Sequence, residues 1–259
     1  FLYATSDLAT IYQRMKDFNP DYMLYVVDNR QSLYFEQVFR ACEISGLTDG
    51  VSLEHDAFGT LNGPDGKPFK TRDGGIMSLR ELISIVKTET RKVIKDNIKE
   101  EDKDDLAEVL AIAAIKYADL LPNRTSDYVF DPVKFSDING KTGPYILYST
   151  VRMKSLLSKS NLKFDKYYKI NTKEERDILI NIIKLRSVIE KSFNMRSLNE
   201  ICEYIYKLTS SFNAFYSNHE VLTEKDECIK ESYLTLINEV YKINKYLLNI
   251  LAITLPDKI

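Results

Sequence analysis

Histidine and cysteine are scarce in this chain of 259 residues, which holds two histidines, His55 and His219, and three cysteines. Cys42, Cys202 and Cys228 lie far apart and follow no C-x-x-C spacing. Zinc sites need four such ligands at characteristic spacings, so we expect no structural metal site. Cysteines without a pairing pattern are typical of reduced thiols in a cytoplasmic protein.

Long apolar runs are missing as well. No stretch is long enough to cross a bilayer, and no signal-peptide pattern or repeat is present. We therefore expect no membrane segment. Together with the cysteine pattern, this favours a cytoplasmic protein, which we expect to be a monomer. The chain begins with Phe1 and enters directly into a motif, so we interpret it as a fragment of a longer protein.

Charge is nearly balanced overall but unevenly distributed. The formal net charge of −2 and the isoelectric point near 5.9 argue against a general nucleic-acid coat protein. Residues 141–207, however, hold 14 lysines and arginines against 7 acidic residues. One basic segment on an acidic protein suits selective contact with a polyanion. Solvated helix faces rich in lysine are the alternative.

The first third of the chain has the pattern of an α/β fold. We predict helical structure over residues 7–17, a buried strand over 22–27, a helix over 32–45 and a second strand over 52–58. Strands separated by a crossover helix form a parallel sheet, and ligands of such sheets bind beyond the carboxyl ends of the strands.

From Ser78 onward the pattern is almost entirely helical. Capping-box pairs predict helix starts at Ser78 with Glu81, Thr172 with Glu175 and Ser197 with Glu200. Glycines at 140 and 143 mark a break, so we expect one domain over residues 1–142 and a second over 143–259. The predicted helices cover residues 102–117, 145–160, 173–193, 198–217 and 225–251, and the short segment 128–130 is predicted to be extended.

A basic loop separates the α/β part from the first of these helices. It reads Lys67-Pro68-Phe69-Lys70-Thr71-Arg72-Asp73-Gly74-Gly75. Glycines allow close backbone approach, and cationic side chains stabilise charge that develops on a triphosphate. The loop is therefore typical of a phosphate-binding segment, although basic loops with glycine are also common as plain solvated turns.

Several ordered segments resemble those of arginyl-tRNA synthetases, a family of class I aminoacyl-tRNA synthetases. The basic loop is similar to the KMSKS signature of that class. Four further stretches match the family's segments in order and spacing over essentially the whole chain: Tyr3-Ala4-Thr5-Ser6-Asp7-Leu8-Ala9, the run from Tyr25 to Phe35, His55-Asp56-Ala57-Phe58-Gly59, and Gly143-Pro144-Tyr145 followed by Tyr148 and Arg152. The segment Phe212-Asn213-Ala214-Phe215-Tyr216 adds another.

The resemblance implies the second half of a Rossmann-like nucleotide-binding domain followed by a helical anticodon-binding domain. It implies ATP-dependent activation of arginine, with Mg²⁺ accompanying ATP, and transfer of arginine to its tRNA. By the same resemblance, the expected site residues are Tyr3, Asp7 and Gln31 for arginine; His55, Phe58, Lys70, Thr71 and Arg72 for ATP; Lys70 and Lys67 for catalysis; and Arg152, Asn213 and Tyr216 for tRNA.

Asp7 has two possible roles. A carboxylate is the best partner for a guanidinium, because it accepts two parallel hydrogen bonds. Aspartate is also favoured as the N-cap of a helix, and Asp7 stands near the expected start of one.

The chain also departs from the family pattern. No H-x-G-H-like signature is present, because the two histidines lie at positions 55 and 219. Tyr34 stands where the family usually has histidine, and Ser6 where it often has arginine or threonine. We therefore expect residues 1–259 to be inactive alone. The alternative is a non-catalytic tRNA-binding module or a synthetase paralogue.

Overall fold

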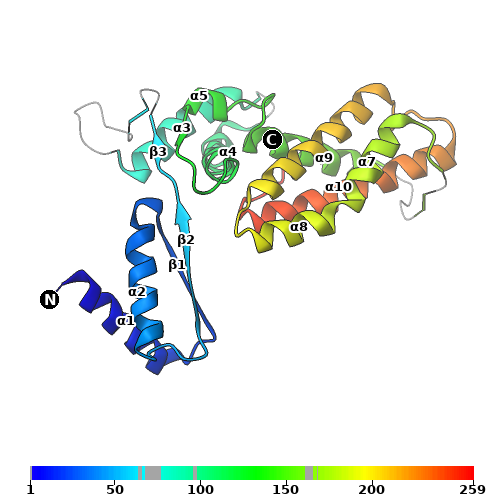
Figure 1. The fold of residues 1–259 in the computed structure, drawn as a ribbon. Helices are drawn as coiled ribbons and strands as arrows, with labels where there is room; N and C mark the ends of the chain where they lie inside the picture. The colour runs from blue at the N-terminus through cyan, green and yellow to red at the C-terminus, as the bar shows by residue number, and fades with distance from the viewer. Residues whose placement is uncertain (1, 64–65, 68–76, 96–97, 161–165, 168) are drawn as a thin grey trace. The chain divides into compact units, whose positions relative to one another are not determined.

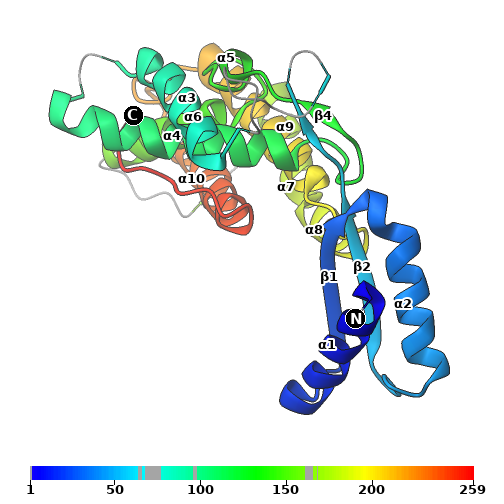
Figure 2. The ribbon, with the colours of Figure 1, turned by 90° about the vertical axis from the view of Figure 1, so that its left-hand side faces the viewer.

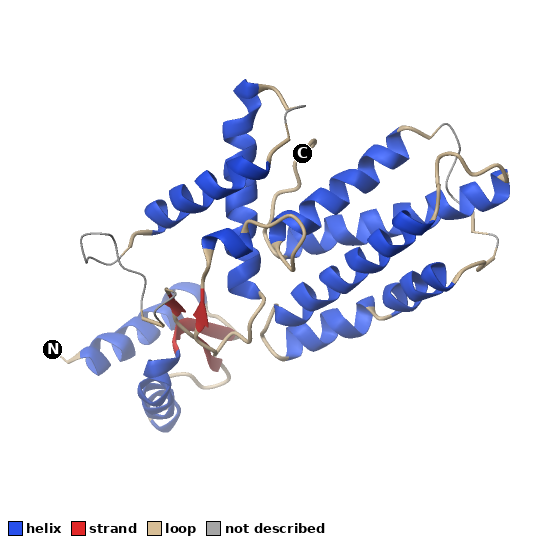
Figure 3. Ribbon diagram, turned by 90° about the horizontal axis from the view of Figure 1, so that it is seen from above, coloured by secondary structure: helices blue, strands red, loops and turns tan. Residues whose placement is uncertain are grey.

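The computed structural model describes residues 2–63, 66–67, 77–95, 98–160, 166–167 and 169–259. Two compact units are present: one comprises residues up to Leu61 together with Arg124–Tyr128, and the other comprises Asn62–Asn123 with Val129–Ile259. The strands belong to a small part of the chain, and helices form most of the remainder (Figure 3). The expected order, α/β followed by helices, is confirmed.

The first unit contains a pair of parallel strands with a crossover helix. Strand β1 (Tyr22–Asp28) pairs in register with β2 (Ser52–Phe58), so that Tyr25 lies opposite His55. Helix α2 (Ser32–Ile44) connects the strands, after a short 3-10 turn, η1 (Asn29–Gln31). Helix α1 (Tyr3–Phe18) and α2 lie on the same face of the strand pair (Figures 1 and 2). The strand predictions are confirmed to within one residue.

Apolar side chains explain how the two helices bind this sheet face. Ile11 of α1, Val38 and Cys42 of α2 and Met23 of β1 form a buried cluster. Strand residues alternate in direction, so Leu24 and Val26 point to the opposite face, where 45% and 61% of their surfaces are exposed. Both helices are therefore held by one side of the sheet.

The second unit is a helical assembly around one large core. It contains α3 (Leu79–Val93), α4 (Glu100–Leu120), α5 (Pro132–Phe135), α6 (Gly143–Ser158), α7 (Lys173–Ile183), α8 (Leu185–Asn194), α9 (Asn199–Asn218) and α10 (Glu227–Ile250). The short strands β3 (Leu61–Asn62) and β4 (Tyr128–Val129) pair with each other, and each has its first residue in the first unit and its second residue in the second unit. The segment 173–193, predicted as one helix, is divided at Lys184.

Two of the three predicted capping boxes are present. The Ser78 and Thr172 hydroxyls accept from the backbone N–H groups of Glu81 and Glu175. In turn, the carboxylate of each glutamate accepts from the backbone N–H of its capping residue. The pair Ser197–Glu200 is wrong: α9 begins at Asn199, and the Ser197 hydroxyl donates to the Asn199 side chain instead. Helix α9 therefore begins without a side-chain cap, and Leu198 is its N-cap residue.

A glycine allows two helices of this unit to approach closely. Gly143, the first residue of α6, lies against the backbone carbonyl of Ala113 in α4, and a side chain at position 143 would overlap that carbonyl. Tyr117 of α4 is fully buried, and its hydroxyl donates to the Cys202 carbonyl of α9 at 2.8 Å. Helix α4 is thus an integral part of the core that α6, α9 and α10 share.

Candidate functional site

Asp7 lies inside helix α1, not at its end. The helix begins at Tyr3, and Leu2 takes the N-cap position with an extended backbone. The carbonyl of Leu2 accepts from the N–H groups of Thr5 and Ser6, so the first turn is closed by backbone bonds. The helix starts four residues earlier than we predicted, and the N-cap role considered for Asp7 is excluded. Tyr3 lies one turn before Asp7 and is 88% exposed.

Tyr34 of α2 reaches Asp7 from the neighbouring helix. Its hydroxyl donates to Oδ2 of Asp7, and this hydrogen bond, together with burial, raises the pKa of Tyr34 to about 12. Within the described part of the chain, no lysine, arginine or histidine forms a salt bridge with Asp7. Gln31, another predicted arginine ligand, is exposed and precedes Tyr34 by three residues. The hydrogen-bond partner of the Asp7 carboxylate is therefore a neutral donor, the Tyr34 hydroxyl.

A second carboxylate lies at the carboxyl end of strand β1. Asp28 accepts from Nε of Arg30 at 2.9 Å and from its terminal nitrogen at 2.7 Å. These hydrogen bonds lower the pKa of Asp28 to about 2. Unlike Asp7, this carboxylate already has a bidentate cationic partner, so it is not free to bind a guanidinium.

His55 and Phe58 lie on strand β2. The imidazole Nε2 of His55 is 3.1 Å from the carbonyl oxygen of Val27, and its ring lies 5.0 Å from the ring of Phe35. Phe58 ends the strand and is 41% exposed. One nitrogen of His55 thus has a backbone carbonyl as its hydrogen-bond partner. Phe58 offers an apolar surface at the carboxyl end of the strand.

Two contacts with Arg124 hold the end of β2 and the residue that follows it. The N–H of Gly59 donates to the Arg124 carbonyl at 2.8 Å, and the Arg124 guanidinium pairs with Asp56 at 2.5 Å. Lys67 is within the described residues, and its carbonyl accepts from Gly63 at 2.7 Å. The other predicted loop residues, Lys70, Thr71 and Arg72, lie outside the described residues.

The three predicted tRNA-binding residues come together on the α6–α9 face. The Arg152 guanidinium lies over the Tyr216 ring, 5.5 Å from its centroid. Tyr216 stacks on Phe212 at 5.9 Å with 19° between the ring planes. The Asn213 amide donates to the Tyr145 hydroxyl at 2.8 Å and to Ser149 at 2.9 Å. Asn213 therefore ties the two helices together, while Arg152 and Tyr216 form a cation–aromatic pair.

The same face contains a second cation–aromatic pair that the sequence did not reveal. Lys141 lies 5.5 Å from the Tyr206 ring centroid and pairs with Glu203. Tyr206 in turn packs on Tyr145 at 5.6 Å. Tyr145 and Tyr206 are recognisable as aromatic residues at helical spacing, but Lys141 lies before the helix and shows no pattern.

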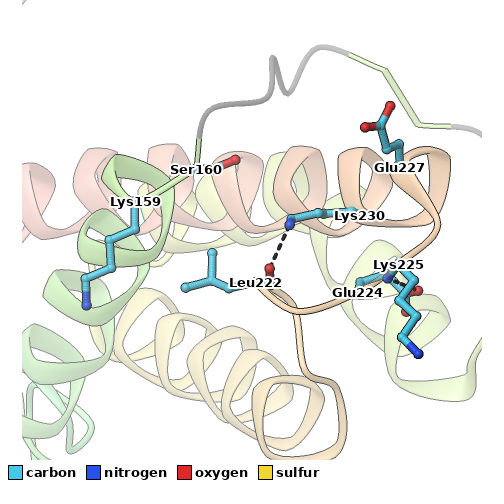
Figure 4. A pocket seen from close by; sticks show the side chains of 7 residues that line it. All are labelled: Lys159, Ser160, Leu222, Glu224, Lys225, Glu227 and Lys230. Carbon is cyan, nitrogen blue, oxygen red and sulfur yellow. Dashed lines mark hydrogen bonds between the residues drawn. The ribbon is translucent and has the colours of Figure 1, made fainter.

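A cavity of about 370 Å³ lies where the α9–α10 connection meets the end of α6 (Figure 4). Lys230 points into it and donates to the carbonyl of Leu222 at 2.6 Å. Lys159, Lys225, Glu224 and Glu227 make the remaining lining charged but mixed in sign. None of the predicted site residues lines this cavity.

Two kinds of feature are absent from the described part of the chain. No group of three or more histidines, cysteines, aspartates or glutamates there could hold a metal ion. No helix in the same part of the chain has the length and apolar character needed to cross a membrane.

Comparison with known proteins relates the chain to a family. A model described as "tRNA synthetases class I (R), catalytic domain" matches residues 1–132, and one described as "DALR anticodon binding domain" matches residues 146–259. The chain is 39% identical to the arginine–tRNA ligase of Agathobacter rectalis over 99% of its own length and 46% of that protein. It is 40% identical to that of Alkaliphilus oremlandii, over 99% and 45%.

Solved structures lead to the same family. The arginyl-tRNA synthetase of Plasmodium falciparum aligns over 100% of this chain and 45% of its own, with a TM-score of 0.81 and 25% identity. The Thermus thermophilus arginyl-tRNA synthetase shares the fold, with a TM-score of 0.80 and 22% identity over 92% of this chain and 41% of its own. This chain thus spans about half the length of the curated relatives it matches, and it belongs to the arginyl-tRNA synthetase family.

Proposed function

We propose that the protein carrying this chain is an arginine–tRNA ligase, and that Asp7 is the carboxylate that binds the arginine side chain. The carrying observation is the position of Asp7: it caps no helix and pairs with no cation among the described residues. A guanidinium would supply the missing positive charge through two parallel hydrogen bonds. Tyr3 and Gln31 would complete the contacts to the substrate.

The reaction that we propose needs no nucleophile from the protein. The arginine carboxylate attacks the α-phosphate of Mg-ATP, and pyrophosphate leaves as the acyl–phosphate bond forms. A ribose hydroxyl of the terminal adenosine of tRNA then attacks the arginyl carbonyl, and AMP leaves. Positioning and charge stabilisation would supply most of the rate.

ATP would bind at the carboxyl end of the strands. We propose that the segment of His55 and Phe58 contacts the adenosine, with the imidazole fixed by the Val27 carbonyl and not used for proton transfer. Lys70, helped by Lys67, Thr71 and Arg72, would act on the phosphates and on the departing pyrophosphate. Charge that grows in the transition state is where such cations contribute most.

The α6–α9 face would bind tRNA. Arg152 and Tyr216 present a cation and a ring in one place, which suits a phosphate and an unpaired base. Asn213 would hold the face together, with a direct RNA contact as its second proposed role. We propose a monomeric, cytoplasmic enzyme, with the catalytic part over residues 1–142 and the anticodon-binding part over 143–259.

Replacing Asp7 tests this function. In the whole protein, Asp7→Asn should lower kcat/KM for arginine by roughly 30- to 1000-fold, because a lost charge-assisted pair costs about 2–4 kcal/mol. Arginine-dependent ATP–pyrophosphate exchange and aminoacylation measure the effect. Asp17→Asn, on the exposed end of the same helix, is the matched control and should leave both rates unchanged.

Two outcomes would contradict the proposal in different ways. Unchanged arginine kinetics in Asp7→Asn would remove Asp7 from the substrate site. A wild-type protein that binds tRNA but never activates arginine would favour the alternative, a non-catalytic tRNA-binding module or a synthetase paralogue.

A further inference from the structure

We propose that Tyr34 is a positioning residue for substrate recognition, holding the Asp7 carboxylate in the orientation that receives a guanidinium. The inference rests on the proposed function, since it assigns a role to a neighbour of the proposed arginine ligand. The direct observation is the hydrogen bond from the Tyr34 hydroxyl to Oδ2 of Asp7, which joins α2 to α1 across 27 residues of sequence.

Tyr34 is itself held in place by packing. Its ring meets Phe35 edge-on, with 5.4 Å between the centroids and 79° between the planes. It also packs against the buried cluster that contains Ile11 and Val38. A hydroxyl on a fixed ring restricts the rotation of the carboxylate that accepts from it, whereas an exposed aspartate on a helix would sample several rotamers.

The neutrality of the donor matters as much as its position. An ionised carboxylate can accept about four hydrogen bonds. Tyr34 uses one of these sites and brings no charge, so Oδ1 and part of Oδ2 remain for a bidentate, positively charged ligand. A lysine or arginine at position 34 would instead neutralise Asp7, as Arg30 does for Asp28.

A nearby cation is directed away from Asp7. Arg14, two turns along α1, donates to the Tyr25 hydroxyl at 3.0 Å and lies over its ring at 5.4 Å. Asp7 also acts electrostatically on Tyr25, so the titratable groups around it are Tyr25, Tyr34 and, through Tyr25, Arg14. Tyr25 thus binds Arg14, whereas Tyr34 positions the carboxylate of Asp7.

The first experiment needs only residues 1–259. Tyrosine-ring carbon-13 NMR at pH 11 should show Tyr34 protonated in the wild type, because its pKa is raised to about 12. In Asp7→Asn the acceptor charge is gone, and a larger fraction of Tyr34 should be ionised at this pH than in the wild type. Equal ionisation of Tyr34 in both chains would overturn the proposal, whatever the activity.

The second experiment uses the whole protein. Tyr34→Phe removes the hydroxyl alone, and we expect KM for arginine to rise roughly 10- to 100-fold while KM for ATP stays the same. Tyr34→His, which can donate from an imidazole N–H, should recover part of the loss. Tyr12→Phe removes a hydroxyl from an exposed position on α1 and should change neither constant.

The outcomes separate the two proposals. An active wild type whose Tyr34→Phe variant has an unchanged arginine KM overturns the role of Tyr34 and leaves the proposed function standing. A wild type that never activates arginine overturns the proposed function, and the NMR comparison still decides whether Tyr34 holds Asp7. A thermal melt of Tyr34→Phe that matches the wild type shows that a KM change is not a folding defect.

Discussion

Ala252 adopts a backbone conformation that is costly for a residue with a Cβ. It follows α10 in the left-handed region, with φ of 53°. Its N–H donates to the Asn249 carbonyl at 3.0 Å, and the N–H of Ile253 donates to Leu248 at 2.8 Å. This pair of bonds is the Schellman arrangement, in which glycine normally takes the left-handed position because it has no Cβ. Ile253 and Leu248 are both buried, so the motif is anchored in the core.

Ala252→Gly should therefore stabilise the chain. An L-residue in the left-handed region costs about 1–2 kcal/mol, and the greater freedom of glycine in the unfolded state offsets part of the gain. We expect the free energy of unfolding in urea to rise by about 0.5–1 kcal/mol. Ala214→Gly, at an exposed position inside α9, is the matched control and should lower it by about 1 kcal/mol. A loss of stability in both variants would show that the Cβ of Ala252 makes contacts that outweigh the backbone strain.

Asp7 shows what could be inferred about a single residue before the fold was known. Its residue type and its resemblance to the family's segment indicated a guanidinium partner, but an N-cap was equally compatible with an aspartate near a helix start. The decision depends on where α1 begins, and helix ends are the least certain feature of a sequence pattern. The contact with Tyr34 could not be predicted, because it joins residues 27 positions apart on two different helices.

At the scale of elements, periodicity and capping predicted most of the structure. The strand pair, α2 and the helix starts at Ser78 and Thr172 are confirmed because local chemistry agrees with the fold at each of them. Ser197–Glu200 has the same pattern but no capping bond, because α9 begins at Asn199 with Leu198 as its N-cap, one residue later than the pattern places it. A spacing rule identifies possible caps but does not fix the residue at which a helix begins.

The α6–α9 face allows a test of RNA binding by a pair of elements. The full chain should bind the arginine-accepting tRNA, and affinity should fall as salt rises, because phosphate contacts release counterions. Tyr216→Ala should weaken binding by about 1–3 kcal/mol if the ring stacks on a base. Tyr246→Ala removes an equally aromatic, exposed side chain from α10 and should have no effect. Fluorescence anisotropy at several salt concentrations measures the tRNA affinity of the unchanged chain and of both variants.

Packing provides the competing explanation for that face. Tyr216 is partly buried against the helical core and stacks on Phe212, so its loss could act through stability. Circular dichroism of Tyr216→Ala distinguishes the two explanations. Weak binding with native helicity supports stacking, whereas weak binding together with a lowered melting temperature assigns the residue to packing.

At the scale of the whole molecule, the sequence pattern correctly predicted that the later part of the chain is helical. It could not predict which residues share the core of that part. Glycines at 140 and 143 predicted a boundary, and a functional boundary there stays a prediction. The packing does not stop at it: Gly143 lies against Ala113, and Tyr117 bonds to Cys202. A turn signal reports a change of backbone direction, whereas a folding unit is defined by the side chains that are buried together.

Truncation tests whether α4 belongs to the folding unit of the bundle. Leu106, Leu110 and Tyr117 of α4 are buried in the same cluster as residues of α6, α9 and α10. Each such side chain contributes about 1.5–3 kcal/mol when buried. A chain of residues 143–259 should therefore be less stable than one of residues 78–259 by more than about 4 kcal/mol. Urea unfolding followed by circular dichroism measures the difference, and 78–259 begins at the Ser78 capping box so that its first helix keeps its own cap. Equal free energies of unfolding for the two chains would mean that the bundle closes its core without α4, and that the boundary expected from the glycines is also a boundary of stability.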